Sequence, residues 1–409
     1  MDIVDEIEKE LPCSDEEEDD SIVDSDTCTA FELEQSFPQK FKIGDELALS
    51  LKKEFILNLC SDSSFTRIAA GCSNGAVHIF DVSEQRGLSH SSLAGFPPIV
   101  STSDPATICG VRFLDETSNC LLIGTTNGLV RLYDLRTNKE QARFEETTEN
   151  NAKSFTSFDR NANGRILCVG TEQIQNEVFL IFYDVRQRQQ SGCYCESHHD
   201  DVTAIRFHEV NPDMFCTGST DGLINIFNIA EESEDDALLI TINTDSSVQK
   251  LNWHKNIHDQ DVISCITHTN DFKLYECQEG DLMAQFERLN VTEQMKRKAP
   301  ENCNVVDCHN IADGGMFLLA GTNSNKGEVL RTLRLQNNQL QPLANFEGNK
   351  QIVRDSIFDA KSHILVTAGE SGIVTLWTPV SAEQTAVLES SSNKLKSKTQ
   401  LKSNKSTPY

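Results

Sequence analysis

Residues 215–229 read FCTGSTDGLINIFNI and decide the fold of this 409-residue chain. An apolar run ends at Gly218, the pair Asp221-Gly222 follows, and alternating apolar residues then lead to Phe227. Alternation predicts a strand with one face toward a core, and Asp-Gly supplies the positive φ that a two-residue hairpin turn requires. The stretch therefore predicts two antiparallel strands joined by a tight turn.

The same pattern returns along the chain, roughly every 46 to 56 residues. Two earlier copies keep its internal spacing, with Gly71, Asn74, Gly75, Phe80 and Asp81 in one and Gly124, Asn127, Gly128, Tyr133 and Asp134 in the other. Further copies run from Gly170 to Asp184, Cys265 to Glu276, Gly321 to Leu333 and Thr367 to Trp377. Repetition at one register indicates an array of similar supersecondary units.

Each repeat contains more than this hairpin. Alternating apolar stretches precede it, at Ile108–Phe113, Val202–Phe207 and Ile352–Phe358, and a short apolar stretch follows it at Ala237–Thr241. Four strands in about 45 residues are the size of one propeller blade. The pattern resembles the WD repeat, and this resemblance implies an all-β, seven-bladed WD-repeat propeller. Residues from Phe41 to Leu51 are placed to supply the last outer strand, which would close the ring and remove its edge.

Charge bias sets two tails apart from the repeats. The segment from Met1 to Glu46 holds 17 acids and 3 bases, in a chain of net charge −27, whereas Ser390 to Tyr409 holds five lysines and no acid. Such segments bury too little apolar surface to offset the entropy lost on ordering. We expect a disordered acidic tail at residues 1–38, the propeller at 39–380, and a disordered Lys/Ser-rich tail at 381–409.

The sequence indicates neither a targeting segment nor a membrane span. The N-terminus is acidic where a signal peptide needs a basic flank, and no stretch approaches the ~18 apolar residues of a span. We therefore expect a soluble intracellular protein of the nucleus, the cytoplasm or both. The 14 cysteines are expected to be reduced, because most fall at strand positions facing a core, including Cys60, Cys109, Cys168, Cys216 and Cys265.

Two groups of Cys and His residues contain potential metal ligands. They are Cys193, Cys195, His198 and His199, and Cys303, Cys308 and His309. Neither group has the paired spacing of a structural zinc site, so no metal is expected. His198 lies four residues before Val202, where a WD repeat commonly carries a His that binds the Asp of the next hairpin. We therefore expect His198 and Asp221 to form a structural pair.

The sequence carries no catalytic motif, such as a phosphate-binding Gly-rich loop, a nucleophile elbow or a His-Glu metal helix, and no cofactor is implied. The acids Asp81, Asp134 and Asp184 recur at one position of the repeat, which favours a structural role. Direct binding of nucleic acid is also disfavoured, because a chain of net charge −27 is repelled by phosphate. Partner proteins remain the expected ligands, bound through loops and tails.

Two boxes in adjacent repeats are the most specific local signal. They are Leu132-Tyr133-Asp134-Leu135-Arg136 and Phe182-Tyr183-Asp184-Val185-Arg186. Each resembles the aromatic-Asp-x-Arg box of substrate receptors for cullin-four RING ubiquitin ligases, with Tyr where Trp is commoner. That resemblance implies that Arg136 and Arg186 present guanidinium groups to the ligase adaptor. The alternative interpretation is that both arginines are solvated blade surface.

A closer resemblance covers roughly Phe55 to Pro379. Its strongest part contains His198 to His208, Asn211 to Met214, Gly218 to Asn228 and the acidic stretch from Glu231 to Leu238. These segments resemble the WD repeat-containing protein 89 family. The resemblance implies a propeller but no defined activity, and the acidic N-terminal tail lies outside it.

The tails and one loop suggest regulation and further partners. Ser14 and Ser233 each precede acids, as acid-directed kinases require, so both are candidate phosphorylation sites. The interpretation that follows is a non-enzymatic protein-interaction scaffold. Two alternatives stay open: a cullin-four substrate receptor that uses the Arg boxes, and an acidic-tailed chaperone or assembly factor for basic ribosomal or chromosomal proteins.

Overall fold

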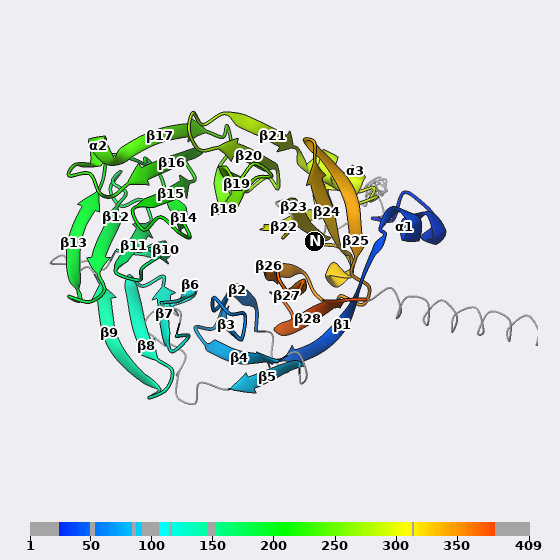
Figure 1. The fold of residues 1–409 in the computed structure, drawn as a ribbon, viewed down its shortest axis with the longest axis horizontal. Helices are drawn as coiled ribbons and strands as arrows, with labels where there is room; N and C mark the ends of the chain where they lie inside the picture. Colours follow the sequence, from blue (N-terminus) through cyan, green and yellow to red (C-terminus); the bar gives the residue numbers. More distant parts are fainter. Residues whose placement is uncertain are drawn as a thin grey trace, which may run out of the picture.

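The computed structural model describes residues 24–49, 54–83, 87–91, 106–114, 117–145, 153–312 and 315–380. Within these ranges the strands stand around a ring, with the chain advancing from one sheet to the next (Figure 1). The helices are short: α1 (Ala30–Ser36), α2 (Glu234–Ala237), α3 (Arg288–Gln294), and the 3-10 turns η1 (Pro300–Asn302) and η2 (Asn325–Gly327). The fold is therefore all-β, as the sequence predicts.

Five separate sheets each contain four consecutive strands. The first has β2 (Ile56–Ser61), β3 (Arg67–Cys72), β4 (Val77–Ser83) and β5 (Gly87–Ser91), and the second β6 (Ile108–Phe113), β7 (Cys120–Thr125), β8 (Leu129–Asp134) and β9 (Lys139–Glu145). The third has β10 (Phe155–Arg160), β11 (Ile166–Thr171), β12 (Leu180–Asp184) and β13 (Gln189–Tyr194), and the fourth β14 (Val202–Phe207), β15 (Met214–Ser219), β16 (Leu223–Asn228) and β17 (Leu238–Asn243). The fifth has β18 (Val248–Lys255), β19 (Asp261–Thr267), β20 (Phe272–Glu276) and β21 (Leu282–Phe286).

The other eight strands form one sheet, in the order β22-β23-β24-β25-β1-β28-β27-β26. They are β22 (Cys303–Asn310), β23 (Met316–Thr322), β24 (Leu330–Gln336), β25 (Gln339–Asn345), β1 (Gln39–Ala48), β26 (Val353–Asp359), β27 (Ile364–Gly369) and β28 (Ile373–Pro379). Strand β1 joins the halves, because it pairs antiparallel with β28 and, through two residue pairs, parallel with β25. Seven separate four-stranded blades were expected; the described chain instead has five, plus this double-width sheet.

The ring is closed by β1, as predicted from residues 41–51. Phe41 opposes Pro379 and Ala48 opposes Ile373, so the beginning of the propeller supplies the strand that the last repeat lacks. The innermost strands contact their neighbours around the whole ring, including β26 against β2. The N–H of Leu59 donates to the carboxylate of Asp355 at 2.6 Å across this closure. The two ends of the array therefore protect each other's edges.

The glycine that recurs in most of the repeats lies where neighbouring sheets pack together. A Cβ at Gly71 would lie 2.7 Å from a methyl of Ile108, and one at Gly170 would lie 2.7 Å from Val202. In both cases the obstructing side chain belongs to the innermost strand of the following sheet. No side chain fits without a shift, so packing between sheets is the physical reason for the glycine in the repeat.

Residues 24–38 correct the prediction of a disordered tail at 1–38. Asp24 and Asp26 form ion pairs with Arg297, at 2.8 and 3.2 Å, and Asp26 also pairs with Arg331 at 2.7 Å. Phe37 is fully buried in the core that α3, the fifth sheet and β22–β25 share. The acids here are neutralised by arginines contributed from the far end of the chain, which local composition does not reveal. Residues 1–23 and 381–409, the rest of both predicted tails, lie outside the described residues.

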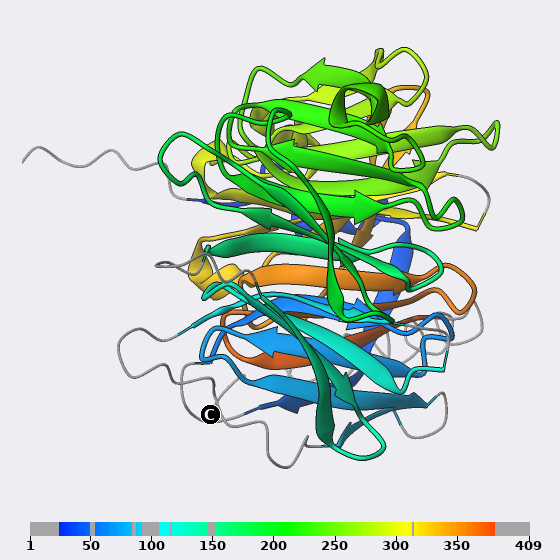
Figure 2. The ribbon, with the colours of Figure 1, turned by 90° about the vertical axis from the view of Figure 1, so that its left-hand side faces the viewer.

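The strands run between two faces of the ring, and the turns lie at those faces (Figure 2). We define the first rim by the turn between β15 and β16, which contains Asp221, and by the loops that lead into innermost strands. Within a sheet the first (innermost) and third strands run in the same direction, because both are antiparallel to the second strand. The turns that follow the first and third strands therefore lie on the other face, which we call the second rim. Val210, Arg136 and Arg186 belong to the second rim.

Candidate interaction sites

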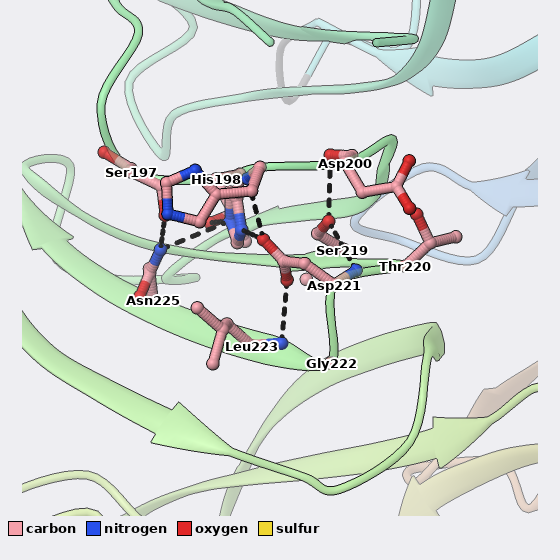
Figure 3. Close-up of polar contacts among 12 residues, drawn as sticks. Ser197, His198, Asp200, Ser219, Thr220, Asp221, Gly222, Leu223 and Asn225 are labelled. Carbon is pink, nitrogen blue, oxygen red and sulfur yellow. Dashed lines mark hydrogen bonds and ion pairs between the residues drawn. The ribbon is translucent and has the colours of Figure 1, made fainter. Parts of the chain in front are cut away.

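His198 and Asp221 lie together on the first rim (Figure 3). The Nδ1 of His198 is 3.0 Å from the Asp221 carboxylate, and because a carboxylate only accepts, Nδ1 donates. The Nε2 of His198 is 2.7 Å from the hydroxyl of Thr217 in β15. A loop, a turn and a strand thus meet at one buried imidazole, as the sequence predicts for the contact between His198 and Asp221.

The Asp221 carboxylate also organises the surrounding backbone. The N–H groups of His199 and Leu223 donate to it at 3.0 and 2.8 Å. Burial alone would raise the pKa of Asp221, but the hydrogen bond and charge of His198, with these N–H groups, lower it to about 2. The charged carboxylate is therefore the form that holds the turn and the loop together.

Ser233 lies on the loop between β16 and β17, where it is exposed and is the N-cap of α2. Its hydroxyl donates to the Asp236 carboxylate at 2.6 Å and accepts from the Asp236 N–H. The next residue, Glu234, accepts from the N–H groups of Cys195 and Glu196 at 2.7 and 2.9 Å. The predicted phosphorylation site thus adjoins the carboxylate that fixes the loop leading to His198.

The first Arg box binds its own acid. Arg136 contacts Asp134 through Nε–Oδ1 at 3.2 Å and Nη2–Oδ2 at 3.1 Å, and its hydrogen bond lowers the pKa of Asp134. The Arg136 side chain is nevertheless 67% exposed. Tyr133 is partly buried beside the core between the first and second sheets. Arg136 is accessible, but its guanidinium already has a carboxylate partner.

The second box differs from the first. Asp184 pairs with Arg165 at 3.2 Å, and the N–H of Gln187 together with Arg165 lowers its pKa. Arg186 is exposed and contacts Asp184 through its backbone N–H at 2.9 Å. Tyr183 is buried and packs its ring against Phe144. Both arginines lie on the second rim in adjacent sheets. The guanidinium of Arg136 contacts the Asp of its own box, whereas Arg186 contacts its Asp through the backbone N–H.

The Cys and His groups are dispersed among different surroundings. Cys193 and Cys195 are exposed, whereas His198 is buried in the network above. Cys303 is buried beside Met295, and the ring of His309 contacts Ser356 at 2.8 Å. Within the ranges that the structure describes, no three His, Cys, Asp or Glu side chains are grouped as metal ligands.

The thirteen described cysteines are all thiols that form no disulfide with one another. Cys60, Cys168, Cys216 and Cys265 are buried, as predicted, and Cys109 is partly buried. Burial raises the pKa of Cys60, Cys109 and Cys265 to about 12, so these thiols stay protonated at neutral pH.

A buried ionic cluster near the ring centre was not predicted. Lys250, on β18, lies 3.0 Å from Asp307 on β22 and 2.7 Å from Asp355 on β26. Burial favours a lower pKa for Lys250, but the two carboxylates outweigh it and raise the pKa. One ammonium therefore links three innermost strands. The available signal was polar residues at alternate positions of an innermost strand, such as Lys250 and Asn252.

Two further expectations concern the acidic N-terminal residues and membrane-spanning segments. Ser14 and the acidic run proposed to bind basic proteins fall in residues 1–23, and both stay predictions. Among the helices of the described ranges, none combines the length and the apolar character that a bilayer span needs.

Comparison with known proteins places this ring in a class. No protein-family model matches the chain. A WD repeat-containing protein of Saccharomyces cerevisiae is 26% identical over 325 residues, covering 76% of this chain and 75% of the relative. A component of the solved Mitotic Checkpoint Complex has the same fold, with a TM-score of 0.61 at 15% identity, over 83% of this chain and 92% of that one. The chain therefore has the β-propeller fold and is similar in sequence to WD repeat-containing proteins.

The proteins similar to this chain include a member of the WD repeat-containing protein 89 family, which its sequence segments resemble. The WD repeat-containing protein 89 homolog of Dictyostelium discoideum is 23% identical over 372 residues, covering 90% of this chain and 93% of the relative. WD repeat-containing protein GTS1 of Arabidopsis thaliana is 22% identical, over 69% of each chain. The resemblance to WD repeat-containing protein 89 is thereby confirmed.

Proposed function

We propose that this protein is a non-enzymatic scaffold that binds other proteins through the rims of its propeller. The observation that carries this proposal is how the acids of the repeats are used. Asp81 pairs with Arg67, Asp134 with Arg136, and Asp184 with Arg165. Each recurring acid thus fixes its own sheet, which leaves the variable turns of a rigid ring to select partners.

We also infer that the double-width sheet acts as two blades, giving seven in all. Its halves are β22–β25 and β26–β28 with β1, and only two residue pairs join them. Each of the seven innermost strands described, β2, β6, β10, β14, β18, β22 and β26, also has a register shift, which follows the first residue in six of them and lies between Val305 and Asp307 in β22. The shared irregularity supports one repeat per innermost strand.

The scaffold proposal is tested by quantitative affinity purification of the tagged full chain from cells. A scaffold recovers a reproducible set of proteins well above a tag-only control. Recovery of no protein above that control, from a chain shown to be folded by thermal melting, would overturn the proposal.

A second candidate function, substrate receptor of a cullin-four ligase, is favoured by the exposure of Arg136 and Arg186 on one rim. The test compares wild type with an Arg136→Asp plus Arg186→Asp variant in the same purification. Loss of the ligase adaptor from the variant alone supports the receptor. An adaptor absent from both samples, with otherwise equal partners, rejects it and leaves the scaffold proposal intact.

A further inference from the structure

A pocket opens on the second rim between the fourth and fifth sheets. Its volume is about 250 Å³, and apolar and charged groups share its wall. Trp253, Met214 and Cys277 supply the apolar part, and Asp261, Glu276 and His208 supply the polar part. A cavity of this composition suits a side chain with an apolar stem and a charged end.

The wall is held in place by its own hydrogen bonds. The indole N–H of Trp253 donates to the carbonyl of Arg206 at 2.9 Å. The Nδ1 of His208 accepts from the N–H groups of Val210 and Asn211, so its Nε2 donates to Asp261 at 3.0 Å. These bonds fix the orientation of the indole, the imidazole and one carboxylate, so the pocket is formed before any partner arrives.

Two aliphatic side chains stand exposed beside this pocket. Val210 is 78% exposed, two residues after His208, and Ile257 is 72% exposed, three residues before Gln260. They lie on the turns that follow β14 and β18, which are neighbouring innermost strands. Exposed aliphatic residues that flank a pocket on both sides are typical of a protein-docking surface rather than of a small-molecule site.

The charge around the pocket is strongly negative. Residues 208–214, 253–261 and 276–281 contain seven carboxylates and one lysine. Five of these acids are exposed: Glu209, Asp213, Asp259, Glu279 and Asp281. Lys255 pairs with Asp261 at 2.7 Å and so offsets only one of the seven carboxylates. A cationic partner is therefore attracted to this rim, and an anionic one is repelled.

We propose that this pocket binds a basic segment of a partner protein, inserting one Lys or Arg side chain between the aliphatic contacts of Val210 and Ile257. The alkyl stem lies against Trp253 and Met214, and the cation meets the carboxylates of Asp261 and Glu276. This inference rests on the scaffold function and specifies its site and the chemistry of its partner. It does not depend on the acidic residues 1–23.

Peptide binding to the full chain tests the proposal by fluorescence anisotropy. The probe is a fluorescein-labelled peptide, GSVLRVLSG, and its control carries Gln in place of Arg. Gln260→Arg places the protein's own cation at the mouth of the pocket, and Gln190→Arg makes the same charge change at an exposed site on β13. A Val210→Ser plus Ile257→Ser variant removes the aliphatic contacts without disturbing a buried residue.

The Arg peptide is expected to bind wild type and Gln190→Arg equally, and at least about tenfold more tightly than the Gln peptide. Gln260→Arg and the double Ser variant should each weaken it by about tenfold or more. Equal binding to Gln260→Arg and Gln190→Arg would overturn the proposal, as would the lack of saturable binding to wild type. If partners are still recovered from cells in that case, the scaffold function stands and only this pocket is rejected.

Discussion

The ammonium of Lys250 lies 2.7 Å from the carboxylate of Asp355, although 105 residues separate them. Lys250 also contacts Asp307 at 3.0 Å, and Asp355 in turn accepts from the N–H of Leu59 at 2.6 Å. One chain of contacts thus links innermost strands of the fifth sheet, both halves of the double-width sheet and the first sheet. The centre of the ring is thus joined by two ion pairs and, across the closure, by one hydrogen bond, while β1 closes the ring at its edge.

Removing that ammonium should destabilise the ring. Lys250→Met leaves the buried carboxylate of Asp307 and the largely buried carboxylate of Asp355 without their cation, and we expect the free energy of unfolding to fall by about 3 kcal/mol. Urea denaturation measures the loss. Lys139→Met, which removes an exposed lysine from β9, is the matched control and should change stability by less than about 0.5 kcal/mol. Equal stabilities for the two variants would show that the central cluster contributes nothing.

The contribution of Asp221 should depend on pH. Its pKa in the folded state is about 2, below the value of 3.8 for a free aspartate, so its stabilisation is fully present above about pH 4. As pH falls from 4 toward 2, protonation removes that contribution. Relative to wild type, Asp221→Asn should lose about 2 kcal/mol at pH 6, and the difference should shrink at pH 3. Urea titrations at both pH values test this; a difference that does not change would contradict it.

Packing between sheets makes a prediction about two glycines. Gly170→Ala places a methyl against Val202, and we expect a loss of about 2 kcal/mol in the free energy of unfolding. A Cβ at Gly192, on β13, meets no atom within 4 Å, so Gly192→Ala should be within about 0.5 kcal/mol of wild type. Thermal melting of both variants decides the matter, and a loss that is equal in the two would refute the packing argument.

The ordered N-terminal segment should contribute to the stability of the propeller. Phe37 is fully buried, so Phe37→Ala should reduce the free energy of unfolding by about 3 kcal/mol. Phe31, on α1, is 68% exposed, and Phe31→Ala is the control, expected to have little effect. Denaturant titration compares them. A small and equal effect of both would mean that residues 24–38 do not belong to the cooperative unit.

Local chemistry explains what could be predicted from the sequence. The hairpin of β15 and β16 follows from alternation and the Asp221-Gly222 turn, and the partner of Asp221 follows from the position of His198 in the repeat. In both cases the interacting residues lie within a few tens of residues of each other in the sequence. The last outer strand could also be located, because the final repeat lacks one and residues 41–51 alternate.

Contacts made only after the ring closes could not be predicted. Lys250 meets Asp355 because two innermost strands, separated by another repeat, converge at the centre. From the sequence, Asp24 and Asp26 are predicted to belong to a disordered acidic tail. Their ion pairs with Arg297 and Arg331 form only in the folded ring, so the sequence near the two acids does not indicate them. The pocket beside Trp253 is likewise formed by two sheets, so neither repeat reveals it alone.

Native mass spectrometry of the tagged full chain, purified gently from cells, tests the scaffold function most directly. The account predicts discrete complexes in which this chain is bound to other proteins at fixed stoichiometry. Complexes should persist in the Lys139→Met control and be reduced in rim variants that melt like wild type. A folded chain found only as a free monomer, under conditions that preserve a known complex, would contradict the central claim.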